Sequence, residues 1–155
     1  MLTSGLFSST TPEWATPQEL YNALDAEFHF ELDPCATEEN HKAPLFYTKA
    51  QDGLAQDWGQ LRTFINPPYG RAIGRWVRRA REHAEGGGLA VALLPCRTDT
   101  QWWGDVMKAT EIRFIKGRVR FGGASAGAPF PSCIVIWGTP RAPVLSMIDR
   151  TGARV

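Results

Sequence analysis

The sequence predicts an α/β fold, in which helices alternate with the strands of an open and mainly parallel sheet. Residues 89–94 form a continuous apolar run, which is typical of a strand covered on both faces. Residues 73–84 carry an apolar stripe at helical spacing, and three glycines at 86–88 end that helix. A short apolar strand at 62–65 precedes the helix. Strand, helix and strand in this order favour parallel pairing.

The part of the chain before residue 62 predicts one helix and one strand. A helix is expected to begin at Thr16 and Pro17, because a hydroxyl residue followed by proline is a common helix start. Residues 28–32 alternate apolar and polar and predict a strand. That strand should end at Asp33, since the proline behind it cannot continue a ladder. Residues 34–60 are polar and are expected to be irregular.

The rest of the chain predicts one further helix and several closing strands. The polar loop at 97–100 can cap a helix over 101–108. The closing strands are expected at 111–115, 119–121 and 133–137. We therefore expect a flexible leader at residues 1–11, a single domain at 12–138 and a weakly ordered C-terminal tail at 139–155.

Composition describes an ordinary globular protein and excludes several classes. The chain has 155 residues, of which 43% are hydrophobic and 21% charged, with a formal net charge of +1. Near-neutral charge means that any nucleic-acid surface must be local. No apolar stretch approaches a membrane span, and the N-terminal residues do not resemble a secretory signal. Three widely spaced cysteines fit reduced thiols in a cytoplasmic protein, and neither they nor the histidines show metal-binding spacing.

The most informative motif is Asn66-Pro67-Pro68-Tyr69-Gly70, directly behind the strand at 62–65. The Asn66 amide oxygen and the Pro67 carbonyl can each accept one hydrogen of a planar amine, which favours a nitrogen with an available lone pair. Consecutive prolines stiffen the loop, and Tyr69 can stack on the ring that carries the amine. The motif alone also fits a surface turn, because asparagine and proline are good turn residues.

Three polar residues, Asp33, Asn66 and Arg97, each follow directly on a predicted strand. Ligand sites in open α/β sheets lie at the carboxyl ends of the strands. We therefore expect these three side chains at one edge of the sheet.

Several motifs occur in an order that identifies a family. They are Thr16-Pro17, Asp33-Pro34-Cys35-Ala36, Asp52-Gly53-Leu54, Asp57-Trp58, the loop at 66–70, the loop at 94–100, Arg120-Phe121-Gly122 and Pro129-Phe130-Pro131-Ser132. This set resembles the phage-type DNA N-6-adenine methyltransferases, often grouped under the name Dam, and it covers residues 5–137. Asn-Pro-Pro-Tyr alone also occurs in methyltransferases that act on glutamine side chains and on guanine in RNA, so the ordered set carries the resemblance.

The resemblance implies a Rossmann-like fold with an antiparallel closing strand and S-adenosylmethionine as the methyl donor. It implies an adenine-specific DNA methyltransferase, encoded by a phage or prophage and acting in the cytoplasm of the bacterial host. The target adenine must leave the duplex, because its amine cannot be reached in line while it is stacked. No glycine-rich loop follows Asp33, but the methyl donor has no pyrophosphate for such a loop to bind.

The same resemblance implies which residues act. The catalytic loop would be Asn66, Pro67, Pro68 and Tyr69. The cofactor contacts would come from Thr16, Asp33, Pro34, Cys35, Asp52, Asp57 and Asn66. Asp33 is expected near the amino-acid end of the donor, and Asp52 and Asp57 near its ribose hydroxyls or adenine amine. Both of the latter also fit ordinary turns, and a role as helix cap alone would explain Thr16.

The candidates for DNA contacts are Arg71, Arg75, Arg97, Arg118, Arg120 and Phe130. Arginine pairs well with phosphate, although the arginine-rich helix at 73–84 also fits a solvated face. Arg118 and Arg120 alternate with Lys116 and would project from one face of a strand. Arg97, at the reactive edge, is the strongest single phosphate candidate. Phe130 lies between two prolines and is either a second stacking surface or a buried aromatic.

Two other functions fit parts of the sequence. One is methylation of another planar nitrogen, on RNA or on a protein glutamine, and the other is a catalytically silent nucleic-acid-binding module with the same fold. An intact Asn66–Tyr69 loop argues against the silent module, and neither an RNA-binding domain nor a docking extension is visible. Because only short loops lie outside the core, we expect a short or relaxed DNA target site. The sequence leaves the oligomeric state open.

Overall fold

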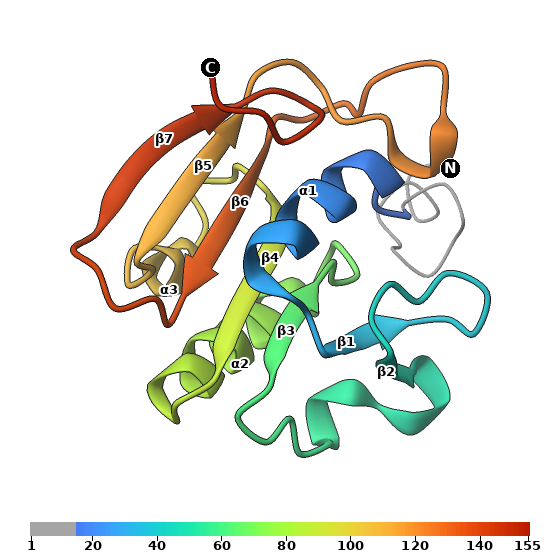
Figure 1. Cartoon of the computed structure of the whole chain (residues 1–155), viewed down its shortest axis with the longest axis vertical. Coiled ribbons are helices and arrows are strands. Elements are labelled where there is room, and N and C mark those ends of the chain that lie inside the picture. Colours follow the sequence, from blue (N-terminus) through green and yellow to red (C-terminus); the bar gives the residue numbers. More distant parts are fainter. Residues whose placement is uncertain (1–14) are drawn as a thin grey trace.

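The computed structural model describes residues 15–155, so the expected leader at 1–11 lies outside the described residues. Seven strands form one sheet in the order β2-β1-β3-β4-β6-β5-β7 (Figure 1). The strands are β1 Leu32–Ala36, β2 Leu45–Thr48, β3 Arg62–Ile65, β4 Leu89–Pro95, β5 Glu111–Ile115, β6 Ser132–Trp137 and β7 Val144–Ile148. The helices are α1 Gln18–Phe28, α2 Ile73–Glu85 and α3 Trp103–Val106, and short 3-10 turns lie at Lys49–Gln51, Gly53–Ala55 and Phe121–Gly123.

The sheet is parallel except for β6, which is antiparallel to both β4 and β5. The mostly parallel α/β prediction is therefore confirmed, as is the antiparallel strand that the resemblance implies. That strand is fully buried and lies inside the sheet. β7, which follows it in the chain, pairs in parallel with β5 at the sheet edge.

Helices cover both faces of the sheet, with α1 on one side and α2 and α3 on the other (Figure 1). Alternate residues of β3 face the two layers, as the two-residue period of a strand requires. The Phe64 ring contacts Tyr21 of α1 edge-on, with 5.2 Å between ring centroids. The Thr63 hydroxyl lies on the other face, 3.3 Å from Nε2 of His83 in α2. The core thus fills both layers around β3 and β4.

The N-terminal helix and strand differ from the prediction. Pro17 is the residue before α1 and makes no side-chain cap, so Thr16 does not cap the helix. The helix extends to Phe28, and β1 begins only at Leu32, so the strand expected at 28–32 is wrong. β1 instead contains Asp33 and Pro34, because its pairing with β2 is interrupted by an irregularity between Asp33 and Ala36. A bulge of this kind accommodates a proline that cannot donate to a ladder.

Other differences lie in the short or exposed elements. β2 lies inside the region expected to be irregular, and the helix expected at 101–108 is only α3. Residues 119–121 do not form a strand, because the chain turns into the 3-10 turn at Phe121–Gly123. The expected tail at 139–155 contains β7, whose pattern is weak because only its last residue is buried.

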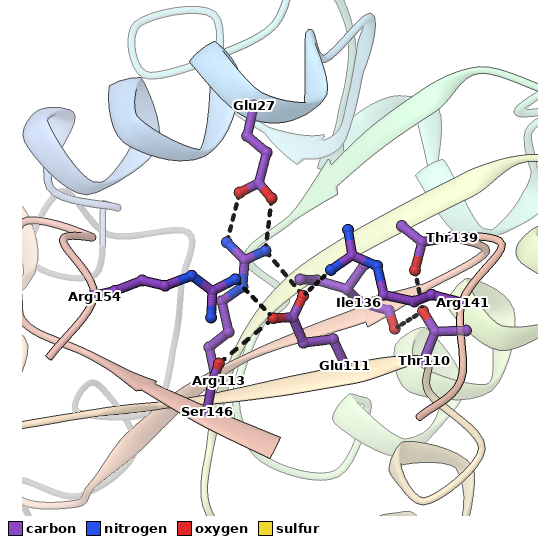
Figure 2. Close-up of polar contacts among 9 residues, drawn as sticks. All are labelled: Glu27, Thr110, Glu111, Arg113, Ile136, Thr139, Arg141, Ser146 and Arg154. Atoms are coloured by element: carbon purple, nitrogen blue, oxygen red, sulfur yellow. Dashed lines mark hydrogen bonds and ion pairs between the residues drawn. The ribbon is translucent and has the colours of Figure 1, made fainter. Parts of the chain in front are cut away.

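An ion-pair network joins this C-terminal segment to the rest of the fold (Figure 2). Glu111, 1% exposed, pairs with Arg113 at 2.9 Å and with Arg154 at 3.1 Å. The Arg113 guanidinium also pairs with Glu27 of α1, at 2.6 Å. The network therefore links α1, β5 and the residues after β7. Glu111 is the first residue of β5 and lies at the end of the sheet where the parallel strands begin, away from the carboxyl end of β3.

Candidate active site

The carboxyl end of β3 places Asn66 beside Asp33 of β1. Asn66 is buried, and its amide nitrogen donates a hydrogen bond to the Thr16 hydroxyl at 3.1 Å. Thr16, Asp33 and Asn66 line one small recess with Cys35 and Lys42. The prediction that Asp33 and Asn66 share one edge of the sheet is confirmed. Thr16 lies two residues before the start of α1, and its hydroxyl orients the Asn66 amide instead of capping the helix.

Asp33 is a buried carboxyl group held by backbone amides. Its two oxygens accept hydrogen bonds from Lys42 N at 3.0 Å and from Cys35 N at 3.3 Å. Burial nevertheless raises the pKa of Asp33 to about 6, and the two amides only reduce that shift. The unfolded carboxyl titrates near 4. Stability linked to this group is therefore present below about pH 4 and is lost as the pH rises to about 6. A cation in the recess would favour the ionised form.

A cavity of about 340 Å³ opens between β1, the Gly53–Ala55 turn and α2. It is lined by Pro34, Cys35, Ala36, Thr37, Thr48, Lys49, Asp52, Gly53, Leu54, Pro68, Ala72 and Trp76. A β carbon at residue 53 would overlap the carbonyl oxygen of Pro34 and lie 3.1 Å from the Trp76 ring, so only glycine fits there. Four of these residues, Pro34, Cys35, Asp52 and Pro68, are expected from the sequence to contact a methyl donor or to belong to the catalytic loop, and on that expectation we call this space the donor cavity.

The two aspartates of the connecting segment differ in position. Asp52 lines the donor cavity and has φ of 52°, a conformation in which aspartate is tolerated. Asp57 does not line that cavity; its carboxylate accepts a hydrogen bond from Gly59 N at 2.8 Å in a local turn. Next to it, Trp58 is fully buried and donates to the Gly53 carbonyl at 2.8 Å. The Asp57-Trp58 motif thus supports the Gly53 turn instead of facing the cavity.

Tyr69 lies on the other side of the loop at Asn66–Tyr69. It is buried, and its hydroxyl donates to the Leu93 carbonyl at 3.3 Å. Burial raises the pKa of Tyr69 well above its usual value, so the phenol stays neutral. Its ring packs edge-on against Phe130 and Phe121, with centroid distances of 5.5 and 6.2 Å. Of the two roles expected for Phe130, a stacking surface or a buried aromatic, the structure shows the buried aromatic, which packs against the Tyr69 ring.

A second cavity, of about 320 Å³, lies beside Tyr69, which the sequence predicts to stack on the target ring, and on that expectation we call it the acceptor cavity. It is lined by Tyr69, Gly70, Ile73, Pro95, Arg97, Thr100 and Trp102. Arg97 follows β4, as predicted, and its guanidinium lies 5.9 Å from the centre of the Phe130 ring. Gly70 has φ of 119°, a backbone conformation that only glycine adopts readily, and it directs the chain from the loop into α2.

The remaining predicted DNA contacts are spread out. Arg118 and Arg120 are exposed, but they follow β5 in a loop and not on a strand face. The Arg118 guanidinium donates to the Ala128 carbonyl at 3.3 Å, which gives it a local role. Arg71 and Arg75 lie together on the exposed side of α2 and its preceding turn.

Sequence reasoning missed Gly53 and Trp102 as site residues. The Asp52-Gly53 pair is visible as a motif, but the requirement for glycine at position 53 depends on its contact with Pro34, which is distant in sequence. Trp102 adjoins Trp103, and two adjacent tryptophans carry no periodicity that marks one of them as exposed. Trp102 is only partly buried, whereas Trp103 is buried.

Within 15–155, no group of three or more His, Cys, Asp or Glu side chains is arranged to hold a metal ion. In the same part of the chain, no helix is long and apolar enough to cross a membrane.

Comparison with known proteins places this fold and motif order among methyltransferases. The family described as DNA N-6-adenine-methyltransferase (Dam) matches residues 4–153. The DNA N-6-adenine-methyltransferase of Escherichia phage T1 is 32% identical over 106 residues, covering 66% of this chain and 44% of that protein. The protein of the same description from Haemophilus phage HP1 is 32% identical over 105 residues, covering 66% and 61%. The chain thus spans less than two thirds of either relative.

Solved structures show the same fold at low identity. A protein from Listeria monocytogenes, described as a class I S-adenosylmethionine-dependent methyltransferase, superposes with a TM-score of 0.56 at 12% identity, covering 90% of this chain and 67% of that one. A type I restriction-modification methyltransferase subunit from Streptococcus thermophilus also gives 0.56 at 12% identity, covering 88% and 47%. These similarities support the fold that the motif order implied.

Proposed function

Because this chain belongs to the DNA N-6-adenine-methyltransferase (Dam) family, we propose that it transfers a methyl group from S-adenosylmethionine to the exocyclic amine of adenine in DNA. The observation that carries the proposal is the position of the Asn66–Tyr69 loop between two cavities. Pro68 lines the donor cavity, and Tyr69 lines the acceptor cavity. One rigid loop thus separates a space for the methyl donor from a space for the methyl acceptor.

The residues that line the donor cavity suit the chemistry of S-adenosylmethionine. The Trp76 ring and Pro68 offer apolar surface for an adenine ring, and Asp52 offers a carboxylate to the ribose hydroxyls. Asp33, in the adjoining recess, suits the ammonium of the methionine part, because its carboxyl is buried without a salt-bridge partner among the described residues. The bound donor supplies an electrophilic methyl group on a sulfonium.

The loop residues prepare the acceptor for attack. The Asn66 amide oxygen accepts one hydrogen of the adenine amine, and the Pro67 carbonyl accepts the other, which holds the nitrogen lone pair toward the methyl group. The Thr16 hydroxyl, bonded to the Asn66 amide nitrogen, fixes the direction of that oxygen. The buried Tyr69 ring forms a wall of the acceptor cavity for a base that has left the duplex. Alignment then contributes much of the rate, and no strong base is required.

Transfer of radiolabelled methyl from S-adenosylmethionine to unmethylated plasmid DNA tests this function. Digestion of the product to nucleosides should place the label in N6-methyladenine. Asn66→Ala should lower the rate by about 100-fold or more, the scale expected for one preorganised hydrogen-bond group. Asn22→Ala is the matched control, since Asn22 is exposed on α1 and bonds only to Gln18 among the contacts of the described residues. Label in cytosine or in protein, or equal transfer by Asn66→Ala, would exclude the proposed reaction.

A further inference from the structure

An open groove of about 660 Å³ runs between α2 and the loop before α3. Gly70, Ile73 and Trp102 line both this groove and the acceptor cavity, so the two spaces adjoin each other. α2 and α3 pack together behind the sheet, which fixes the two walls of the groove relative to the catalytic loop (Figure 1). A chain that carries the target base into the acceptor cavity would leave along this groove.

The groove is lined by three exposed arginines: Arg71, Arg75 and Arg78. Arg75 and Arg78 lie three residues apart in α2 and so share one face of the helix, and Arg71 lies in the turn that precedes it. Among residues 15–155, none of the three guanidinium groups lies within 4.0 Å of a carboxylate. Within α2 the rise from Arg75 to Arg78 is about 4.5 Å. A DNA strand carries one phosphate per about 3.4 Å of duplex axis, so these two arginines can contact about two neighbouring phosphates.

The other two arginines of α2 have structural partners. Arg79 lies 4.3 Å above the Trp58 ring and donates to the Gln56 carbonyl. Arg81 pairs with Asp105 at 2.6 Å and with Glu85 at 2.7 Å. Asp105 also lines the groove, but its charge is compensated by Arg81. The groove therefore presents a positive surface, although the five arginines look alike in the sequence.

Trp102 stands at the junction between the groove and the acceptor cavity. It is partly exposed and is held by its neighbours: its ring lies 5.7 Å from that of Trp103. It also packs closely on Gly74 of α2, where a β carbon would lie 3.4 Å from the Trp102 Cβ. An indole held in this way at a positive groove has the properties of a stacking platform for a nucleobase.

We infer that this groove binds the sugar-phosphate strand that carries the target adenine, with Trp102 stacked on the base next to the target. The inference rests on the proposed function for the identity of the target. The arginines contribute sequence-independent affinity through phosphates. The target adenine leaves a gap in the base stack when it enters the acceptor cavity. Trp102 packs on the base beside that gap and so retains the strand. None of these contacts reads a base edge, which agrees with the short or relaxed target site expected from the sequence.

The test is binding of a fluorescein-labelled single-stranded DNA oligonucleotide, measured by anisotropy over a range of salt concentrations without cofactor. The Arg75→Ala, Arg78→Ala double variant should reduce the slope of log affinity against log salt by about 1.4, the value for two phosphate contacts on a single strand. Trp102→Leu should weaken binding on the order of tenfold, whereas Trp102→Phe should retain most of the affinity. Lys108→Ala is the control, because this exposed lysine lies beyond α3, toward the opposite edge of the sheet.

An abasic strand of the same length separates stacking from phosphate binding. With this probe, Trp102→Leu should bind like the wild type, and the double arginine variant should still lose affinity. Unchanged affinity and salt dependence in the double variant, or equal loss for Trp102→Leu on both probes, would overturn the inference. These measurements need no methyl transfer. If the variants behave as expected while the wild-type protein methylates no DNA, the groove stands and the proposed function fails.

Discussion

Gly53→Ala should close the donor cavity from inside the protein. Ordinary van der Waals contact begins at 3.4 Å, but the new β carbon would lie 3.0 Å from the Pro34 carbonyl carbon and 3.1 Å from a Trp76 ring carbon, and it would overlap the Pro34 oxygen. The obstructing atoms belong mainly to the backbone of β1, which cannot turn aside as a side chain can. Overpacking of this kind costs about 1–3 kcal/mol of stability.

The same displacement should also impair cofactor binding. Pro34 and Gly53 both line the donor cavity, so pushing them apart changes its shape where the donor would lie. We expect the affinity for S-adenosylmethionine to fall at least tenfold, equivalent to about 1.4 kcal/mol. Urea unfolding gives the stability, and isothermal titration calorimetry gives the affinity.

Gly104→Ala is the matched control for this substitution. Gly104 lies in α3, and a β carbon there meets no atom within 4 Å. Alanine is the better helix former by about 1 kcal/mol, so this variant should be as stable as the wild type or more so. Wild-type stability together with wild-type cofactor affinity in Gly53→Ala would refute the assignment of the donor cavity.

Three further substitutions test other parts of the site and fold. In the wild type, the unfolding free energy should fall by up to about 3 kcal/mol between about pH 4 and pH 6 as Asp33 ionises, and Asp33→Asn should abolish this fall in urea titrations across that range. The same substitution should weaken cofactor binding at pH 7. Thr16→Val removes the acceptor for the Asn66 amide and should lower the methyl-transfer rate about tenfold, with about 1–3 kcal/mol of stability lost; an unchanged rate would separate Thr16 from catalysis. Glu111→Gln leaves the buried Arg113 guanidinium short of one carboxylate and should cost about 3–5 kcal/mol in urea unfolding, while cofactor affinity stays at the wild-type value.

Sequence patterns predicted the buried elements of the fold well. Residues 89–94 and 133–137 are strands, as predicted, because burial on both faces leaves a continuous apolar run, and the short strand predicted at 62–65 is confirmed as β3. α2 was equally clear, since one of its faces is apolar and the other is rich in arginine. Elements of this kind carry their own signal in the chain.

The elements that were missed depend on partners distant in sequence. β1 continues through Pro34 because a local irregularity in its pairing with β2 removes the need for an amide donor. β7 has one buried residue and owes its place to pairing with β5 and to the Arg154 ion pair with Glu111. Neither pairing partner can be recognised from the strand's own residues.

The candidate site divides in the same way. The position of Asn66 behind β3 follows from local sequence, and so does its proximity to Asp33, because parallel strands end at one edge. The division of the arginines of α2 into structural and groove-lining groups does not follow from sequence. Trp58 contacts Arg79 and Asp105 pairs with Arg81 only in the folded protein. Glu85 pairs with Arg81 one helical turn away.

In the proposed reaction, the Asn66–Tyr69 loop acts on the methyl acceptor while a separate cavity holds the donor. A single-turnover experiment tests it most directly: enzyme saturated with labelled S-adenosylmethionine is mixed with excess DNA, and labelled DNA is followed with time. For Asn66→Ala we predict a transfer rate lower by about 100-fold or more, with a calorimetric Kd for the donor within threefold of wild type. A wild-type transfer rate, or a loss of transfer explained entirely by a loss of donor binding, would contradict the claim.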